Sequence, residues 1–407
     1  MSKNYENIDV SVEFGGVKLQ SPFILSSGPL TYAAEGMIKA HENGAGAVVT
    51  KTIRIKRALN PVTHIATMNS DSLVNCEKWA DSDPEVWFNR EIPMAKKAGC
   101  VVIASVGHTL EEAEAIVAPA EAAGADFIEL VSYTETDMLP MLEATIARVK
   151  IPIICKLSSN YPAWKDPVEC ARKCIEIGKA NNHKVMIAAI DSVGPVLAVD
   201  VYTQGPKVSS ENGYAWLSGG AIRPISMKIN YEIMKMDRNI ISYGIGGVTK
   251  AEDALEYLMV GTTGVGICSI AIIKGIEYIS KIIKDLKKKM AELGYNNIAE
   301  LRGSAIANLS KETSNEPTVG EQEQDVESDA KLQFDFDKDI CIKCNKCVNI
   351  CSYDARTLNF PEMRVDRNLC RNCGACTSVC PTRALTSIAV KKFTRTDELQ
   401  NYVAYFS

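Results

Sequence analysis

Two cysteine-rich runs near the C-terminus place the strongest constraint on what this chain can fold into. They are "CIKCNKCVNICS" at residues 341–352 and "CRNCGACTSVCP" at residues 370–381. Both follow the spacing C-x2-C-x2-C-x3-C, in which three close thiolates bind one iron-sulfur cubane and the fourth binds its neighbour. The spacing therefore predicts two [4Fe-4S] clusters. The first takes Cys341, Cys344, Cys347 and the remote Cys380, and the second takes Cys370, Cys373, Cys376 and the remote Cys351.

Zinc sites and disulfides are the other common uses of closely spaced cysteines. Zinc is usually held by paired C-x2-C units and not by triplets with a following x3-C, which favours the iron-sulfur interpretation. Pro381 follows the last cysteine of the second run, as is usual in such runs, whereas Ser352 takes that place in the first. The other six of the 14 cysteines show no disulfide framework, which indicates a reducing compartment.

The remaining composition is that of a globular protein. The formal net charge of -5 gives no basic excess for nucleic acid. The N-terminus lacks the apolar core of a signal peptide, and no apolar run reaches the roughly 18 residues that would span a bilayer. We therefore expect a cytoplasmic protein that binds neither nucleic acid nor a membrane.

A polar, acidic segment divides the chain. Residues 311–333, "KETSNEPTVGEQEQDVESDAKLQ", contain almost no aliphatic side chains and cannot bury enough surface to fold alone. We predict a large domain over residues 1–309, an acidic linker over residues 310–333, and a ferredoxin-like domain with two clusters over residues 334–407.

The large domain alternates apolar, β-branched runs with amphipathic segments of helical length, the pattern of a buried parallel sheet. Eight such runs within about 250 residues favour a closed (β/α)8 TIM barrel over an open doubly wound sheet. Thr109 with Glu112, and Thr249 with Glu252, predict the starts of two helices. The segment 10–22 predicts a β-hairpin at the bottom of the barrel. The predicted strands cover residues 22–27, 46–52, 100–106, 126–132, 152–158, 185–192, 240–247 and 264–269.

In such a barrel the chemistry lies at the carboxyl ends of the strands. These ends carry Lys51, Thr52, Lys156, Gly246, Gly247, Cys268 and Ser269. The two glycines suit either a phosphate held by backbone N–H groups or a plain tight turn. Most lysines are solvated, but an unpaired ammonium inside the mouth needs an anionic partner, which the reduced ring of a flavin would supply.

Seven stretches of the large domain carry a family resemblance. In order, they are "SPFILSSGP", "AVVTKT", "SLVNCE", "IPIICKLS", "LSGGAIRP", "IISYGIGGV" and "GICS". They resemble the FMN barrel of the dihydroorotate dehydrogenase superfamily. With the C-terminal ferredoxin, nearly the whole chain is most similar to the pyrimidine-reducing half of dihydropyrimidine dehydrogenase, a separate subunit in bacteria. The specific parts are "SGGAIRP" and the two cysteine runs.

The resemblance implies an FMN cofactor and a role for each matching residue. Ser26, Ser27 and Gly28 would line the flavin, and Lys51 and Lys156 would contact its ring. Asn75 matches an asparagine that binds the pyrimidine in the family. Ribityl and phosphate would be held by Gly219, Gly246, Gly247, Cys268 and Ser269.

The active-site loop departs from the family. After the fourth strand, superfamily members have an Asn and then a loop with a Cys or Ser that exchanges the substrate proton. This chain has Val131 at the place of the Asn, and the shortened loop has no cysteine. After the sixth strand, a Thr-Asn-Thr-like string becomes Ile190-Asp191-Ser192, so a carboxylate replaces an amide that grips the pyrimidine.

Three interpretations follow from these departures. In one, the enzyme reduces uracil or thymine, and Tyr133, Thr134 or Glu135 supplies the proton. In another, it reduces a different conjugated C=C bond in a small, cyclic, carbonyl-containing substrate, which Asp191 and Asn75 recognise. His108 is then a candidate acid, although a lone histidine at a helix start is more often a cap.

In the third interpretation, the protein is an electron-transfer subunit without an organic substrate of its own. Both enzymatic interpretations describe an oxidoreductase acting on CH-CH groups, in which electrons pass from the clusters to FMN and then to the substrate. No G-x-G-x-x-G follows a predicted strand. We therefore expect an NAD(P)H-oxidising flavoprotein subunit or a ferredoxin as electron donor, and a homodimer or hetero-oligomer by resemblance.

Overall fold

The computed structural model describes residues 5–309 and 331–390. The contacts within the chain divide it into two units, residues 1–313 and residues 314–407. The predicted linker, apart from residues 331–333, and residues 391–407 of the predicted ferredoxin-like domain lie outside the described residues. Each unit is a separate compact body, so each has its own fold and its own core.

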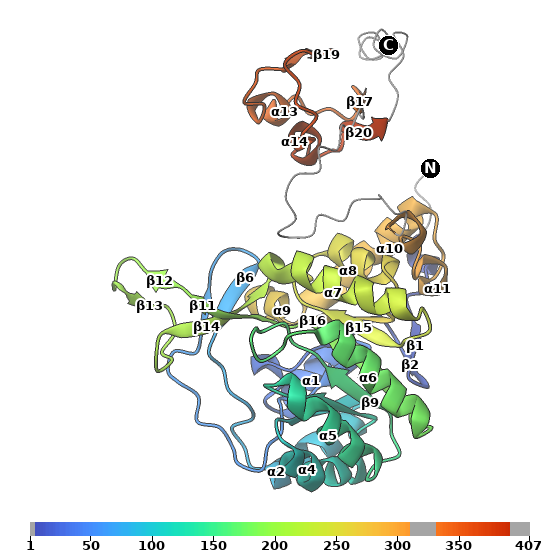
Figure 1. The fold of residues 1–407 in the computed structure, drawn as a ribbon. Helices are drawn as coiled ribbons and strands as arrows, with labels where there is room; N and C mark the ends of the chain where they lie inside the picture. Colours follow the sequence, from blue (N-terminus) through green and yellow to red (C-terminus); the bar gives the residue numbers. More distant parts are fainter. Residues whose placement is uncertain (1–4, 310–330, 391–407) are drawn as a thin grey trace. The chain divides into compact units, whose positions relative to one another are not determined.

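The large unit is built on a closed barrel of parallel strands, and all eight predicted strands are present (Figure 1). Around the barrel the order is β10, β15, β16, β3, β4, β7, β8 and β9. Hydrophobic side chains fill these strands on both faces, as a sheet covered by helices requires. Their bounds are β3 Phe23–Leu25, β4 Ala47–Val49, β7 Val102–Gly107, β8 Phe127–Val131, β9 Ile153–Lys156, β10 Val185–Ala189, β15 Ser242–Ile245 and β16 Gly264–Ile267.

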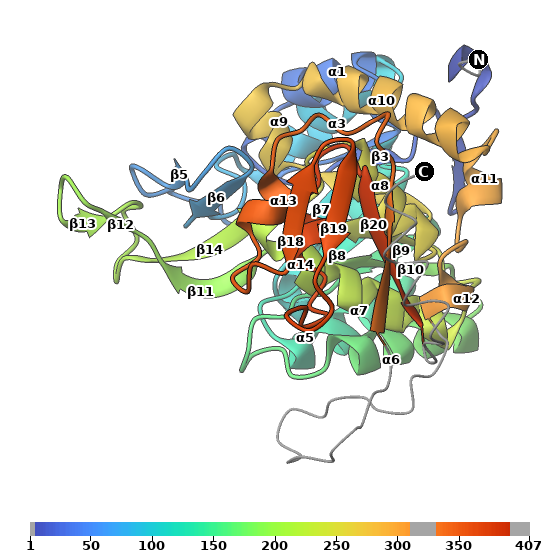
Figure 2. The same cartoon turned by 90° about the horizontal axis from the view of Figure 1, so that it is seen from above.

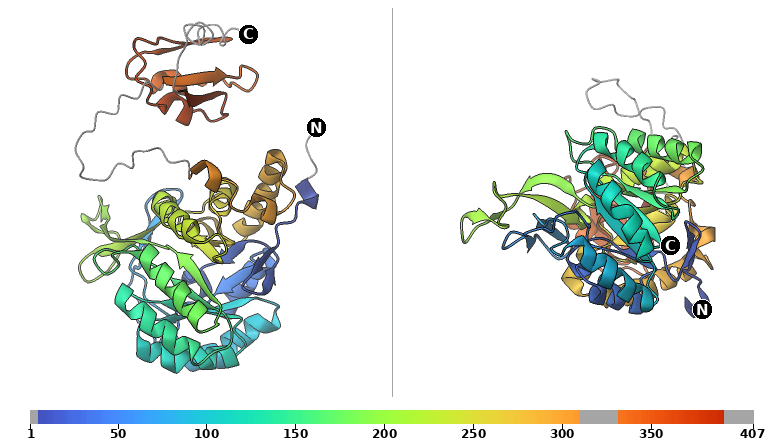
Figure 3. Two further views of the ribbon diagram at one scale, coloured as in Figure 1. Left: turned by 45° about the vertical axis from the view of Figure 1, so that its right-hand side comes forward. Right: turned by 90° about the horizontal axis from the view of Figure 1, so that it is seen from below.

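Helices surround this barrel on the outside (Figure 3). The main ones are α1 Ala34–Glu42, α3 Ile92–Lys97, α4 Leu110–Ala122, α5 Glu135–Ile146, α6 Pro167–Ala180, α7 Arg223–Met236, α8 Ala251–Met259, α9 Ser269–Lys274 and α10 Tyr278–Leu293. Shorter ones are α2 Pro84–Val86, α11 Ile298–Leu301 and α12 Ile306–Leu309. No helix among residues 5–309 and 331–390 has both the length and the apolar character needed to cross a membrane.

One predicted helix start is confirmed and one is wrong. The side chain of Thr109 accepts the backbone N–H of Glu112 at 3.3 Å and caps α4. At α8 the cap falls on Lys250, and Asp253 accepts the backbone N–H groups of Thr249 and Lys250. Asp253 is buried beside Arg223, which explains why it makes the cap contact that the sequence assigned to Glu252.

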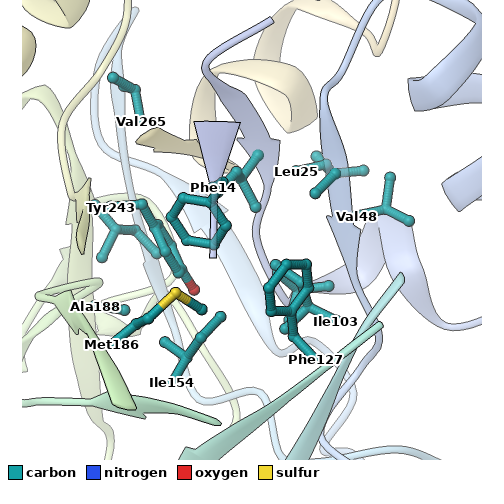
Figure 4. Packing of buried hydrophobic residues seen from close by; sticks show 14 of the residues in the cluster. Phe14, Leu25, Val48, Ile103, Phe127, Ile154, Met186, Ala188, Tyr243 and Val265 are labelled. Carbon is teal, nitrogen blue, oxygen red and sulfur yellow. The ribbon is translucent and has the colours of Figure 1, made fainter. Parts of the chain in front are cut away.

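The predicted hairpin closes the bottom of the barrel. It consists of β1 Val12–Phe14 and β2 Val17–Leu19, which pair antiparallel. The Phe14 ring is fully buried and packs edge-on against Phe127 and Tyr243, with centroid distances of 5.5 and 6.2 Å (Figure 4). Edge-to-face packing adds to the burial of apolar area, so this plug stabilises the barrel floor.

An accessory sheet, which the sequence did not predict, lies beside the barrel. Its antiparallel strands β5 Ile65–Thr67, β6 Ser72–Asn75, β14 Tyr214–Gly219 and β11 Val193–Leu197 come from two separate excursions of the chain. The ribbon β12 Val199–Asp200 and β13 Gly205–Pro206 extends away from the barrel (Figure 2). The sheet carries Asn75 and Gly219, so it brings two predicted site residues together.

The described part of the small unit, residues 331–390, contains two antiparallel strand pairs and two short helices, as expected for a dicluster ferredoxin. The elements are β17 Lys331–Phe336 with β20 Leu385–Val390, β18 Arg356–Asn359 with β19 Glu362–Val365, α13 Lys346–Asn349 and α14 Ala375–Ser378. The predicted linker therefore ends too late, because residues 331–333 already belong to β17. Pairing with β20 and the burial of Phe334 order this polar stretch.

Candidate active site

The first group at the barrel mouth is a buried ion pair after β4. Lys51 Nζ lies 2.9 Å from Glu77 Oε2, and both side chains are about 7% exposed. Burial lowers the pKa of Lys51, and Glu77 only partly opposes this change. The other oxygen, Glu77 Oε1, is buried without a hydrogen-bond partner among the described residues. The anionic partner that the sequence required for Lys51 is thus a protein carboxylate, and one of its oxygens is available to a further donor.

A second buried lysine connects the mouth to the barrel interior. Lys156, at the end of β9, lies 2.7 Å from Asp191 Oδ2 and 3.8 Å from Glu129 Oε1. Glu129 is fully buried and accepts a hydrogen bond from Tyr243 Oη. Burial by itself would lower the pKa of Lys156, but the two carboxylates outweigh it and raise this pKa. Lys156 is therefore held in its charged form.

Asp191 is the exposed end of this network. Its side chain is 40% exposed at the end of β10 and also accepts a hydrogen bond from Ser192 Oγ at 3.2 Å. Burial would raise the pKa of Asp191, but the ammonium of Lys156 outweighs burial and lowers it. A charged carboxylate with an open side accepts hydrogen bonds and cannot donate them.

Two aromatic rings stack at the ends of β7 and β8. The rings of His108 and Tyr133 lie 3.9 Å apart between centroids and 24° from parallel. Burial lowers the pKa of His108 to about 3, and the nearby charge of Arg54 adds to this effect. His108 is therefore neutral near pH 7, which makes it a poor proton donor. Its Nδ1 is buried without a partner among residues 5–309 and 331–390.

Tyr133 keeps its hydroxyl available. Residue 133 is 56% exposed, and the structure shows no hydrogen bond from its hydroxyl to another described residue. The surrounding protein nevertheless desolvates the group and raises its pKa, which keeps the phenol protonated near neutral pH. A protonated, accessible phenol is able to donate a proton to a bound molecule.

The other two candidate donors of this loop are engaged in local structure. The Thr134 hydroxyl bonds the Asp137 carboxylate at the start of α5. Glu135 Oε2 accepts the backbone N–H groups of Lys165 and Asp166 at 2.9 and 3.1 Å. These contacts fix the start of α5 to the loop after β9, so the structure gives both side chains a scaffold role.

Asn75 lies across the mouth on the accessory sheet. Its Nδ2 is 3.4 Å from the carbonyl of Trp216, and its Oδ1 accepts the backbone N–H of Glu77 at 3.3 Å. The second contact links Asn75 to the carboxylate that pairs with Lys51. The position of Asn75 thus depends on pairing between β6 and β14, where Asn75 lies opposite Trp216, 141 positions later in the sequence.

The ends of β3 and β16 meet at Cys268. A Cβ atom added at Gly28 would lie 2.5 Å from Cys268 Sγ, so only glycine fits there. Burial raises the pKa of Cys268 to about 12, and the charge of Glu77 adds to the rise. Ser26 is buried beside β16, and its Oγ has no partner among the described residues. Thr52, after β4, bonds Ser105 at 3.1 Å, and Ser27 is partly exposed.

Three glycines form a small-residue cradle on the side of the mouth opposite β7 and β8. Gly219, Gly246 and Gly247 have φ angles of 89°, 115° and 78°, which favour glycine. A Cβ atom at Gly247 would lie 2.5 Å from the Cβ atom of Arg223. Ser269 Oγ bonds Ser218 Oγ at 3.1 Å and joins β16 to the accessory sheet at this point.

In the small unit, four cysteines line one cavity. They are Cys341, Cys344, Cys347 and Cys380, three from the first run and the last from the second. α13 and α14 follow residues with positive φ, Asn345 at 55° and Gly374 at 74°. These left-handed residues turn each run so that the next cysteine faces inward. The thiols of Cys351, Cys370, Cys373 and Cys376 are also free of disulfides.

Comparison with known proteins decides the family. Residues 130–290 match the family described as dihydroorotate dehydrogenase, and residues 340–384 match the 4Fe-4S dicluster domain. The catalytic subunit of dihydroorotate dehydrogenase B (NAD(+)) from Thermoplasma volcanium is 31% identical over 313 residues, covering 73% of this chain and 99% of that protein. The chain belongs to the dihydroorotate dehydrogenase superfamily. The superfamily resemblance inferred from the sequence is thus confirmed.

Two other dehydrogenases are also similar to this chain. Chloroplastic dihydropyrimidine dehydrogenase (NADP(+)) from Arabidopsis thaliana is 25% identical over 341 residues, covering 73% of this chain and 77% of that protein. The crystal structure of the dihydroorotate dehydrogenase from Eimeria tenella, in complex with ferulenol, covers 72% of this chain and 88% of that chain with a TM-score of 0.58. At 16% identity, this last likeness shows the fold alone.

Membership of the dihydroorotate dehydrogenase superfamily makes the protein an iron-sulfur flavoenzyme, an oxidoreductase acting on CH-CH groups that uses FMN and iron-sulfur clusters. The barrel mouth fits a flavin. Buried polar atoms of Ser26, Glu77 and His108 lack partners among the described residues, and a cradle of glycines lies on the other side. Sequence reasoning missed Glu77 and Glu129. Glu77 stands two residues after Asn75 in the family-like "SLVNCE", and this proximity was the one available signal.

Proposed function

We propose that the barrel reduces a conjugated C=C bond of a small, cyclic, carbonyl-containing substrate other than uracil or thymine. The observation that carries this proposal is the ion pair between Asp191 and Lys156 at the mouth. Because Asp191 is charged and 40% exposed, it accepts hydrogen bonds where an amide would both donate and accept them. The preferred substrate therefore presents an N–H group or a positive charge to Asp191, and Asn75 contacts it from the accessory sheet.

FMN, when bound, supplies a hydride to the electron-poor carbon of the substrate. Residues of this chain would hold the FMN. We propose that the flavin ring is contacted by Ser26, Ser27, Gly28, Thr52, Lys51 and Lys156. The ribityl and phosphate side is assigned to Gly219, Gly246, Gly247, Cys268 and Ser269. The buried charges of Lys51 and Lys156, both held beside carboxylates, support this assignment because they keep the ring environment polar without water.

Tyr133 is the proton donor in this proposal. Residue 133 is 56% exposed, its ring stacks on that of His108, and its raised pKa keeps the phenol protonated. The neutral His108 ring stacks on the Tyr133 ring and keeps it in place, so His108 is a positioning residue. Glu135 and Thr134 are tied to backbone and helix contacts, which argues against either as the acid.

The ferredoxin unit would hold the iron-sulfur clusters that supply electrons for the reaction. We propose that Cys341, Cys344, Cys347 and Cys380 bind one [4Fe-4S] cluster and that Cys370, Cys373, Cys376 and Cys351 bind the other. The Thermoplasma relative is named as the catalytic subunit of an NAD(+)-linked enzyme. This name supports an NAD(P)H-oxidising partner subunit as the donor. We propose this flavoprotein subunit, or alternatively a ferredoxin, as the donor, and a homodimer or hetero-oligomer in the cytoplasm.

Substrate-dependent reoxidation of the reduced holoenzyme tests the proposal. The anaerobic protein is photoreduced and mixed with uracil, with thymine, and with cyclic enones that carry or lack a ring N–H group, while flavin absorbance is followed. The proposal expects fast reoxidation by an enone with an N–H group, at least about tenfold faster than by either pyrimidine. Faster reoxidation by uracil or thymine would identify a dihydropyrimidine dehydrogenase, and oxidation only by a redox protein would identify an electron-transfer subunit.

A further inference from the structure

An arginine lies in the core of the small unit, where a charged side chain is rare. Arg356, the first residue of β18, is 3% exposed and pairs across the hairpin with Val365, which is also buried. Arginine is almost never fully buried unless it is paired. Neither terminal nitrogen of Arg356 has a hydrogen-bond partner within the described residues 331–390. Within the described residues, the fold therefore holds a cation that forms no ion pair with a carboxylate.

The ring on which Arg356 stacks belongs to an apolar cluster that includes or contacts predicted cluster ligands. Its guanidinium stacks on the Phe334 ring at 4.2 Å from the centroid. Phe334 belongs to a buried apolar cluster that contains Cys347 and against which Cys376 packs. Arg356 therefore stacks on a member of the same apolar cluster that holds one cysteine of the first set and contacts one cysteine of the second.

We propose that Arg356 is a buried cation shared by the two iron-sulfur clusters and that its charge raises the reduction potential of both. Cluster ligation by four thiolates concentrates negative charge, which supplies the missing counter-charge for the guanidinium. Reduction adds one electron from the external donor to a cluster and makes it more negative by one unit, with no bond broken and no proton taken up. A fixed positive charge in a low-dielectric core favours that reduced state.

A second arginine, Arg367, lies near the same ring but has a protein partner. The Arg367 guanidinium lies over the same Phe334 ring, at 5.2 Å, but its Nη1 donates to the carbonyl of Leu332 at 2.6 Å. The Arg367 guanidinium is therefore hydrogen-bonded to the backbone of β17. This inference concerns electron delivery only, so it holds whichever substrate the barrel reduces.

Potentiometric titration of the full-length holoenzyme, followed by electron paramagnetic resonance of the reduced clusters, tests the proposal. The neutral variants are Arg356→Met, which keeps the apolar stem, and Arg356→Gln, which keeps hydrogen-bonding capacity. Arg356→Lys retains the charge. Arg364→Met, which removes an exposed cation from β19, is the matched control.

At a fixed applied potential, we expect the ratio of reduced to oxidised cluster to fall about tenfold or more in both neutral variants. For a one-electron couple this corresponds to about 59 mV. Arg356→Lys and Arg364→Met should stay within about threefold of the parent protein. Unchanged potentials in a neutral variant with full iron content would overturn the proposal.

Cluster assembly gives a second readout if the neutral variants do not hold iron. Retention of iron and near-parent potentials in Arg356→Lys alone would support the need for a cation at this position. Loss of iron in all three variants, including Arg356→Lys, would overturn the proposal, because a residue that only fills the core gives that result.

Discussion

Lys156 Nζ lies 2.7 Å from Asp191 Oδ2 and thereby ties the end of β9 to the end of β10. On its inner side the same ammonium faces Glu129 at 3.8 Å. Two carboxylates around one buried cation keep that cation charged, and the cation in turn keeps Asp191 ionised. The mouth therefore presents a fixed negative acceptor to whatever binds over it.

Asp191→Asn should lower kcat/KM for the preferred substrate by about tenfold or more, because it removes the charged acceptor. Flavin content should be unchanged. Steady-state kinetics and the flavin-to-protein ratio are the measurements. The control is Asp285→Asn on α10, which breaks an exposed Asp–Lys pair of the same 2.7 Å length. Equal losses in both variants would contradict a role for Asp191 in recognition.

Tyr133→Phe should slow reoxidation of the reduced enzyme by substrate about a hundredfold to ten-thousandfold, since the proton donor is lost. Reduction of the flavin by the electron donor should continue. Because the protein raises the pKa of Tyr133, the parent rate should stay level to about pH 10. Stopped-flow absorbance checks both points. The exposed Tyr161→Phe is the control, and a normal rate in Tyr133→Phe would remove Tyr133 from the mechanism.

His108→Gln should reduce the loss of stability on acidification. The pKa of His108 is about 3 in the folded state and near 6.5 when unfolded, so between these values the unfolded chain binds the extra proton. In the parent protein, His108 should therefore lower the free energy of unfolding by about 2 kcal/mol between pH 6.5 and pH 4.5. Urea unfolding followed by tryptophan fluorescence reports on the large unit, because all four tryptophans lie there. A slope in His108→Gln identical to that of the parent protein would contradict the lowered pKa of His108.

Phe14→Ala should destabilise the barrel by about 3–5 kcal/mol, because it empties a fully buried aromatic position between Phe127 and Tyr243. The same urea titration measures this effect. Tyr202→Ala, at the exposed turn of the β12–β13 ribbon, should change stability by less than about 0.5 kcal/mol. A small effect of Phe14→Ala would show that the hairpin is not part of the cooperative core.

Cys373→Ser should prevent reduction of the flavin by the physiological donor while direct photoreduction and FMN content remain normal. The reason is that serine is a poor ligand for a cluster whose other ligands are thiolates. Iron analysis and donor-dependent flavin reduction measure the effect. Ser378→Ala on α14 is the control, since residue 378 is no predicted ligand. Normal turnover in Cys373→Ser would exclude this cluster from the electron path.

The local features of this protein were readable from the sequence. Eight strands, the floor hairpin and the Thr109 cap follow from periodicity and from contacts within a few residues. The cysteine spacing predicted the cluster domain for a similar reason, because the four cysteines of each run lie within about ten residues of one another. The glycines at 246 and 247 also stand at a strand end that periodicity alone locates.

The tertiary structure decided the charges of the site. Lys51 meets Glu77, and Lys156 meets Asp191 and Glu129, only because barrel closure and the accessory sheet bring distant segments together. The choice of Asp253 over Glu252 at α8, and the burial of Arg356, likewise depend on which face of an element turns inward. The local sequence pattern determines where helices and strands form. The partners and the burial of each ionisable side chain, and hence its protonation, depend on long-range packing that no short stretch of sequence contains.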